Sequence, residues 1–165
     1  SRNEEHVWPQ TWWGKPGCMV PYYALTLFAG IRPDWQHGEI SRLRQKDIRL
    51  DTGVILIEPE VSKVNEKRSI KIQPNLRRWL DEYPIDEYRI IPKRFRYLKE
   101  AVRDKFKLQH DVLRHTYISM LVGAFRSVGD AALQSGNSEA VIRKHYLNLK
   151  SEEDSQSFWR IVPSL

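Results

Sequence analysis

Apolar side chains recur at helical spacing in several separate stretches of the chain. Residues 20–28 predict a helix, from the apolar positions Val20, Tyr23, Ala24, Leu27 and Phe28. Gly30 follows directly and is suited to cap its C-terminus. The stretch 39–44 predicts one or two helical turns with Ile40 and Leu43 inward. Further helices are expected at residues 74–80, 92–107, 112–124, 128–133 and 139–146.

The sequence also predicts local features of three of these helices. Asp111 is a candidate N-cap for the helix over 112–124. In the helix over 139–146, Val141, Ile142 and His145 share a face. The apolar stripe of the helix over 92–107 consists of Phe95, Leu98, Val102 and Phe106.

The pattern changes between the second and third of these helices. Residues 47–50, 54–58 and 68–72 alternate β-branched and polar side chains, which is typical of half-buried strands. Residues 51–53 and 62–67 provide the two turns. The chain is therefore expected to be α+β and mainly helical, a helix bundle with a small three-stranded antiparallel sheet.

At 165 residues, 41% of them hydrophobic, the chain suits a single domain with a sizeable core. We expect a core over 20–150, preceded by a loop-rich lead-in over 1–19 that carries Trp8, Trp12 and Trp13. The tail, 151–165, is acidic at its start and apolar at its end. Its apolar part is expected to dock in a groove on its own domain or on a neighbouring copy. Because it begins at Ser1, the chain is expected to be a fragment of a longer protein.

The formal charge of +6 and a pI near 9.5 favour a polyanionic partner, although a merely basic protein has the same totals. The most basic stretch is 93–107, where a cationic face can follow phosphates. The DNA-binding candidates in it are Lys93, Arg94, Arg96, Lys99 and Arg103.

Cys18 is the single cysteine, which excludes an internal disulfide framework and a cysteine-rich metal site. The sequence contains no Asp/Glu/His cluster with metal-ligand spacing, so no metal and no cofactor is expected. It also lacks an apolar run of membrane-spanning length and a signal peptide. These features predict a cytoplasmic protein without a membrane partner.

Four separate positions carry side chains suited to phosphate chemistry. Arg114 lies near a predicted helix start, with Asp111 three residues and His110 four residues before it. Arg32 follows the glycine-ended first helix, and Lys63 falls in the second strand connection. Tyr146 ends the short helix that follows the break at 136–138. Taken singly, these residues are explained by ordinary structural roles, as surface cations and a core aromatic side chain.

Taken in order, the segments 29–33, 113–116, 136–138 and Tyr146 resemble the C-terminal catalytic domain of tyrosine recombinases, the phage-integrase family. The resemblance implies an integrase-type fold and DNA integration or recombination, as in bacterial and phage mobile elements. It assigns Arg32 and Arg114 to the phosphate, Tyr146 to a covalent 3′-phosphotyrosyl intermediate and Lys63 to the leaving oxygen. The implied partners are duplex DNA and other copies of the protein in a DNA-bound tetramer.

Two positions differ from the family pattern. Asp111 stands where the family has a histidine, with His110 displaced by one residue, so either could act as the base. Asn137 replaces a histidine or tryptophan and can donate a hydrogen bond to phosphate.

Glu39 is the expected counterpart of the family's acidic residue, after an insertion at 34–38. Lys67 is the alternative to Lys63 if the hairpin register differs.

Three functions therefore compete at the level of sequence. The first is a DNA strand transferase, the second is a DNA-binding module of the same fold without catalysis, and the third is a basic interaction protein with accidental motifs. A covalent assay separates the first two functions, and salt-insensitive DNA binding would favour the third.

Overall fold

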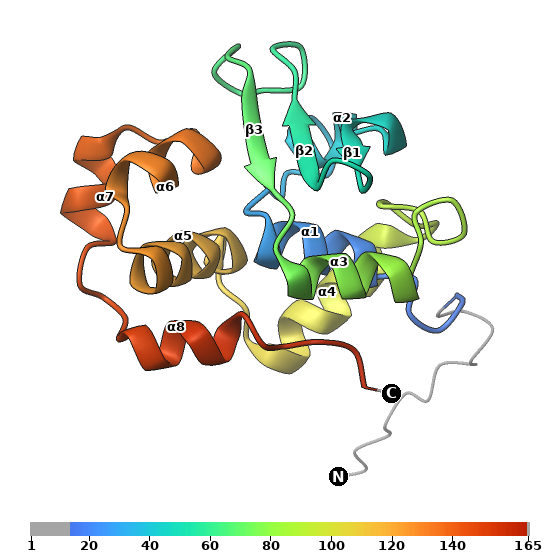
Figure 1. The fold of residues 1–165 in the computed structure, drawn as a ribbon. Coiled ribbons are helices and arrows are strands. Elements are labelled where there is room, and N and C mark those ends of the chain that lie inside the picture. Colours follow the sequence, from blue (N-terminus) through green and yellow to red (C-terminus); the bar gives the residue numbers. More distant parts are fainter. Residues whose placement is uncertain (1–13, 165) are drawn as a thin grey trace, which may run out of the picture.

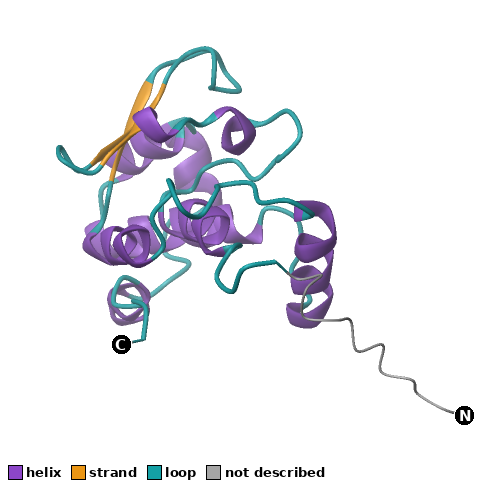
Figure 2. Ribbon diagram, turned by 90° about the vertical axis from the view of Figure 1, so that its right-hand side faces the viewer, coloured by secondary structure: helices purple, strands orange, loops and turns teal. Residues whose placement is uncertain are grey.

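The computed structural model describes residues 14–164, so most of the expected lead-in over 1–19, with its three tryptophans, lies outside the described residues. The described part is α+β and mainly helical, as predicted, with a small sheet at one end (Figures 1 and 2). Its helices are α1 (Val20–Phe28), α2 (Glu39–Arg42), the 3-10 turn η2 (Gln45–Asp47), α3 (Pro74–Glu82), α4 (Phe95–Phe106), α5 (Val112–Phe125), α6 (Val128–Ser135), α7 (Glu139–His145) and α8 (Glu152–Phe158).

The sheet has three antiparallel strands in the order β1 (Ile48–Arg49), β2 (Val54–Ile57) and β3 (Arg68–Lys71). Each strand lies within its predicted range and is shorter than expected. Ile55 pairs with Ile48 on one side and with Ile70 on the other, which places three apolar side chains on one buried face. This face joins the main hydrophobic core, and β3 also contacts α6.

Helix α5 is the central helix of the bundle, in contact with α1, α6 and α8. Tyr117, Ile118 and Leu121 on this helix are buried in the core. The C-terminal tail folds back beneath α5 as helix α8, whose N-terminus is capped by Ser151 (Figure 1). Phe158 packs against Phe28 with ring centroids 5.1 Å apart, so the tail's groove is on its own domain. None of the described helices is long and apolar enough to cross a membrane.

Three local predictions were wrong. Asp111 precedes α5 in a left-handed conformation and its side chain accepts no capping hydrogen bond, although the helix begins where expected. Helix α4 starts at Phe95 instead of Pro92, and Phe106 at its end is 63% exposed. On α7 only Ile142 is buried, whereas Val141 and His145, expected on the same face, are exposed.

The end of α1 depends on Gly30. This residue has φ +62, a left-handed conformation that glycine adopts without steric cost, and it directs the chain toward Arg32. A Cβ atom at this position would lie 2.2 Å from the ring of Tyr117 on α5. Gly30 is therefore required both by its backbone conformation and by the close contact between α1 and α5.

We expect Gly30→Ala to lower the free energy of unfolding by about 2–5 kcal/mol, from about 1–2 for backbone strain and about 1–3 for overpacking. Gly53→Ala is the matched control, because Gly53 also has a positive φ, +71, but nothing lies within 4 Å of its added Cβ. In the control, the free energy of unfolding should fall only by the contribution of backbone strain, about 1–2 kcal/mol. Denaturant unfolding measures both, and equal losses would contradict the packing argument.

Candidate active site

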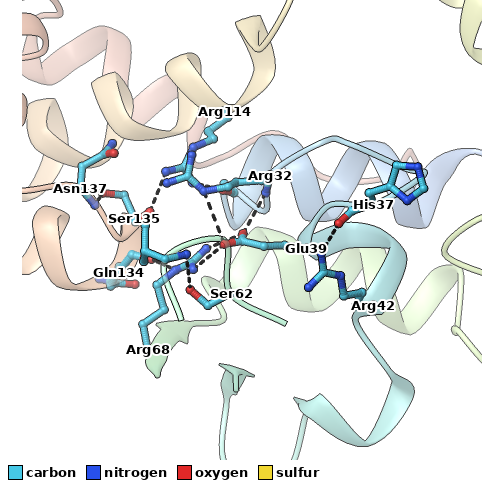
Figure 3. Close-up of polar contacts among 12 residues, drawn as sticks. Arg32, His37, Glu39, Arg42, Ser62, Arg68, Arg114, Gln134, Ser135 and Asn137 are labelled. Carbon is cyan, nitrogen blue, oxygen red and sulfur yellow. Dashed lines mark hydrogen bonds and ion pairs between the residues drawn. The ribbon is translucent and has the colours of Figure 1, made fainter. Parts of the chain in front are cut away.

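The site is built around the carboxylate of Glu39, which is 1% exposed. Arg68 donates two hydrogen bonds of 2.7 Å to its two oxygens. The Arg32 backbone N–H donates to Oε2 at 3.2 Å, and the Arg32 Nε lies 3.5 Å from Oε1, an ion pair without hydrogen-bond geometry. Figure 3 shows the two arginines directed at the same carboxylate. Glu39 thus holds both arginines in place.

The turn between Arg32 and Glu39 explains how the two residues meet. The Asp34 carboxylate accepts the backbone N–H groups of Gln36 and His37, closing a tight turn over the expected insertion. Gly38 follows with its backbone so close that an added Cβ would lie 2.6 Å from Asp34. The chain therefore turns back and starts α2 with Glu39 directed at the buried site.

Arg114 is the second buried arginine, 4% exposed on the first turn of α5. Its guanidinium donates hydrogen bonds to the carbonyl of Gly30 and, at 2.7 Å, to the carbonyl of Ser135. Arg68 Nε donates at 3.1 Å to the adjacent carbonyl of Gln134. Two arginines thus hold the C-terminal carbonyls of α6, directly before the Gly136 break.

The cluster carries more positive than negative charge. Burial of the Glu39 carboxyl would by itself raise its pKa, but hydrogen bonds from Arg68 and the nearby charges of Arg68 and Arg32 lower that pKa overall. Burial, reinforced by Arg32 and Arg68, lowers the pKa of Arg114 to about 10. Three guanidinium groups around one carboxylate form an environment that favours an additional anion.

Tyr146 is buried at the C-terminal end of α7. Its hydroxyl is hydrogen-bonded to Nδ1 of His115, and the two rings stack with centroids 5.8 Å apart at 25°. Burial raises the pKa of the Tyr146 hydroxyl, Arg114 and Arg32 oppose that rise, and Asp111 adds to it. Tyr146 is therefore within electrostatic reach of both arginines.

His115 is a site residue that the sequence reasoning missed. Its only signal was its position directly after Arg114, in the motif that carries the family resemblance. The contact with Tyr146 joins residues 31 positions apart and depends on where the end of α7 lies relative to the start of α5. Helical periodicity alone does not predict such a contact.

A cleft of about 990 Å³ lies next to the cluster, lined by α4 and by the connection between β2 and β3. On α4, Arg96, Lys99 and Arg103 face it at spacings of three and four residues, which is one helix face. Four acidic residues are in the described lining, against six arginines and lysines. Those cations are Arg32, Arg42, Lys63, Arg96, Lys99 and Arg103.

The structure brings some predicted residues to this cleft and leaves others away from it. Lys63 is exposed and lines the cleft together with Arg32, whereas Lys67 pairs with Glu58 at 3.5 Å outside the described lining. Asp111 and His110 also line it, with the His110 side chain 89% exposed. Predicted residues outside the described lining are Lys93, Arg94, Arg114, Asn137 and Tyr146.

Asp111 and Asn137 have few fixed contacts. The Oδ1 atom of Asp111 is buried and accepts no hydrogen bond from the described residues. The backbone N–H of Asn137 donates to the Ser135 hydroxyl at 3.3 Å, which places Asn137 beside the α6 terminus held by Arg114 (Figure 3). Within residues 14–164, no group of three or more His, Cys, Asp or Glu side chains is arranged to hold a metal ion.

No family model, curated protein or solved structure matches the chain.

We expect Glu39→Gln to lower the free energy of unfolding at pH 7 by about 3–5 kcal/mol, because the substitution leaves Arg68 buried without a counter-charge. The pKa of Glu39 is lowered in the folded protein, so its stabilisation is present above the unfolded value of about 4.3 and is lost as pH falls through the folded pKa. The difference between wild type and variant should therefore shrink below about pH 4.

Glu58→Gln is the matched control, since Glu58 pairs with Lys67 in a largely exposed pair at 3.5 Å. It should change the free energy of unfolding by at most about 1 kcal/mol. Urea titrations between pH 3 and 8 measure both variants. A Glu39→Gln loss as small as that of the control would show that the buried pair does not hold the site together.

Proposed function

We propose that the chain is a DNA strand-cleaving and rejoining domain of the tyrosine recombinase type, with an integrase-type fold. One observation carries the proposal: Arg114 and Arg32, which pairs with the buried Glu39 carboxylate, are far apart in sequence but lie within electrostatic reach of each other and of the buried Tyr146 hydroxyl. A surplus of guanidinium beside a potential nucleophile suits attack on a phosphodiester.

The arginines would neutralise the charge that develops on the non-bridging phosphate oxygens. A guanidinium offers five N–H donors in a planar fork, and Arg114 has donors left after its bonds to the Gly30 and Ser135 carbonyls. Burial strengthens the interaction because little water screens it. Glu39 and Arg68 would keep Arg32 in position before the DNA arrives.

In the cleavage step, Tyr146 Oη forms a bond to phosphorus while the bond from phosphorus to the 5′ oxygen breaks. The departing oxygen takes a proton from the Lys63 ammonium, which lines the same cleft as Arg32. The product is a 3′-phosphotyrosyl link, which conserves the bond energy for rejoining to a second strand. Exchange of strands would bring further copies of the protein onto the same DNA.

The cleft supports a path for the DNA backbone. Arg96 pairs with Glu100 at 3.3 Å and Arg103 with Asp104 at 3.0 Å, both on the exposed side of α4. Exposed ion pairs contribute at most about 1 kcal/mol, so phosphates can replace their acidic partners. The spacing of Arg96, Lys99 and Arg103 along one face suits successive contacts to one strand.

A DNA-binding domain of the same fold without catalysis is the alternative. The carboxylate of Asp111 favours it, because this residue lines the cleft where the family has a histidine, and a carboxylate repels phosphate. Asn137 points the same way, since it cannot carry a positive charge.

We expect duplex DNA binding to weaken at least about tenfold between 50 and 200 mM salt, as phosphate contacts release counterions. The triple variant Arg96→Gln, Lys99→Gln, Arg103→Gln should bind at least about tenfold more weakly at low salt. The slope of log affinity against log salt concentration, here called the salt slope, should become smaller by about 2–3. Fluorescence anisotropy on a labelled duplex measures both quantities.

The matched control removes three cations that lie outside the described lining of the cleft: Lys46→Gln, Lys105→Gln, Lys107→Gln. It makes the same change in net charge and should retain most of the salt slope. If the two triple variants weaken binding equally, net charge and not the cleft accounts for the affinity.

The catalytic prediction is that Tyr146 becomes covalently attached to DNA. The full-length protein is incubated with a pool of nicked duplexes of randomised sequence, in which the short strand downstream of the cut diffuses away and traps the intermediate. Adducts that survive denaturing detergent are recovered and the peptide is identified by mass spectrometry. Tyr146→Phe should abolish the adduct and leave binding nearly intact, because only one hydroxyl is lost.

Three further variants sharpen this test. Arg114→Ala should slow adduct formation by at least about two orders of magnitude, the scale of losing a transition-state donor. A 5′-bridging sulfur, which leaves without a proton, should rescue Lys63→Ala but not Tyr146→Phe. Tyr97→Phe, a control on the exposed side of α4, should form the adduct as wild type does. DNA binding by the wild type without any adduct would favour the binding module instead.

A further inference from the structure

The attack by Tyr146 requires a group that takes its proton, and the arginines cannot serve. A guanidinium stays protonated in proteins, so Arg32 and Arg114 can stabilise a tyrosinate but cannot accept its hydrogen. Burial of the hydroxyl raises its pKa, so the proton does not leave easily on its own. A proton acceptor in direct contact with Oη is therefore needed.

We propose that His115 is this acceptor: its Nδ1 holds the Tyr146 hydroxyl and takes the proton as the tyrosine attacks phosphorus. The assignment rests on the proposed function and replaces the two bases that the sequence suggested, His110 and Asp111. In this arrangement the neutral imidazole carries its hydrogen on Nε2, which leaves Nδ1 free to accept the hydrogen bond from Oη.

The geometry favours His115 over both other groups. His115 is hydrogen-bonded to the Tyr146 hydroxyl and its ring stacks on the tyrosine ring, which fixes the distance and the angle of approach. His110 has a side chain that is 89% exposed and lies 3.8 Å from Asp111. Asp111 acts on the hydroxyl as a negative charge that opposes ionisation.

The chemistry of the groups favours the same assignment. A carboxylate is a much weaker base than an imidazole, so an imidazole in contact with the hydroxyl is the better proton acceptor. The charged groups that act on the Tyr146 hydroxyl are Arg114 on α5, Arg32 after α1 and Asp111 before α5. The two cations assist ionisation and the one anion opposes it.

The step is balanced in protons and charge. Tyr146 Oη bonds to phosphorus, its hydrogen moves to Nδ1 and makes His115 an imidazolium, and the 5′ oxygen leaves with a proton from Lys63. Rejoining runs the same transfers in reverse, with the 5′ hydroxyl as nucleophile. Because His115 is on the exposed side of α5, its imidazolium can also exchange the proton with solvent between the two steps.

The first experiment tests the contact without DNA. A single 3-fluorotyrosine is placed at position 146 and its fluorine resonance is followed from pH 5 to 8. Protonation of the Nδ1 that holds the hydroxyl should change the chemical shift in one step within this range. The step should disappear in His115→Phe, which keeps an aromatic ring and loses the nitrogen, and should remain in His145→Phe. His145 is the matched control, an exposed histidine next to Tyr146 in sequence. A step that persists in His115→Phe would overturn the assignment.

The second experiment measures the rate of adduct formation on the trapped DNA against pH. The wild-type rate should fall as the solution becomes acidic, because a protonated imidazole cannot accept a further proton. His115→Phe should be slower at neutral pH by at least about a hundredfold. His115→Gln should be similarly slow, since an amide oxygen accepts a hydrogen bond but not a proton. Neither His115 variant should show this fall in rate at acidic pH, and His145→Phe should retain it.

The outcomes separate this assignment from the function on which it rests. An adduct that forms equally fast in wild type and in His115→Phe overturns the role of His115 and leaves strand cleavage standing. No adduct in the wild type contradicts strand cleavage and, with it, the proton transfer, whatever the fluorine titration gives. A lost step in the fluorine titration together with a hundredfold slower adduct in His115→Phe supports both proposals.

Discussion

The site depends on one buried ion pair, between Glu39 on α2 and Arg68 on β3. Removing two charges from water costs several kcal/mol for each, and the cost is offset only when every donor and acceptor finds a partner. Here the carboxylate accepts two bonds from Arg68 and one from the Arg32 backbone, and the remaining Arg68 Nε bonds to the Gln134 carbonyl. These bonds connect α2, β3 and the end of α6. Any large displacement of one of these elements would leave a charge buried without its partner, so the pair defines a single arrangement.

Arg114 extends this constraint to the candidate nucleophile. Its bond to the Ser135 carbonyl and the Arg68 bond to the Gln134 carbonyl hold the end of α6, after which Gly136 turns the chain with φ +72. Helix α7 begins three residues later, at Glu139, with Ser138 as its N-cap, and ends next to Tyr146. The groups that would bind a phosphate therefore also position the residue that would attack it. This coupling costs stability in the free protein, because Arg32 and Arg68 act on Arg114 as like charges, and an anion in the site would reduce that repulsion.

The apolar stripe of helix α4 has a buried part and an unburied part, which the hydrophobic pattern did not distinguish. Phe95 and Leu98 are buried in the fold, whereas Val102 and Phe106, predicted to continue the same inward stripe, line an open apolar groove with Trp79 and Ile161. Only the first half of the helix is therefore anchored in the core. That anchoring is sufficient to direct Arg96, Lys99 and Arg103 into the polar cleft, because residues three and four apart share a face. The cationic surface is thus fixed by a small number of apolar contacts at one end of the helix.

The features that sequence could predict are those set by near neighbours in the chain. Periodicity and turn residues predict the bounds of α1, its end at Gly30 and the three-stranded antiparallel sheet. All three are present in the structure. The site is made instead by contacts between distant residues: Glu39 with Arg68, Arg114 with Gly30, and His115 with Tyr146. Arg68 looked like an ordinary strand residue and His115 like an ordinary neighbour of Arg114. Each became a site residue only when packing supplied a partner, and packing is determined by the whole core and not by any local pattern. The resemblance to a family named candidate residues only by their order along the chain. Order along the chain does not reveal that His115 lies against the Tyr146 hydroxyl, because that contact depends on packing in three dimensions.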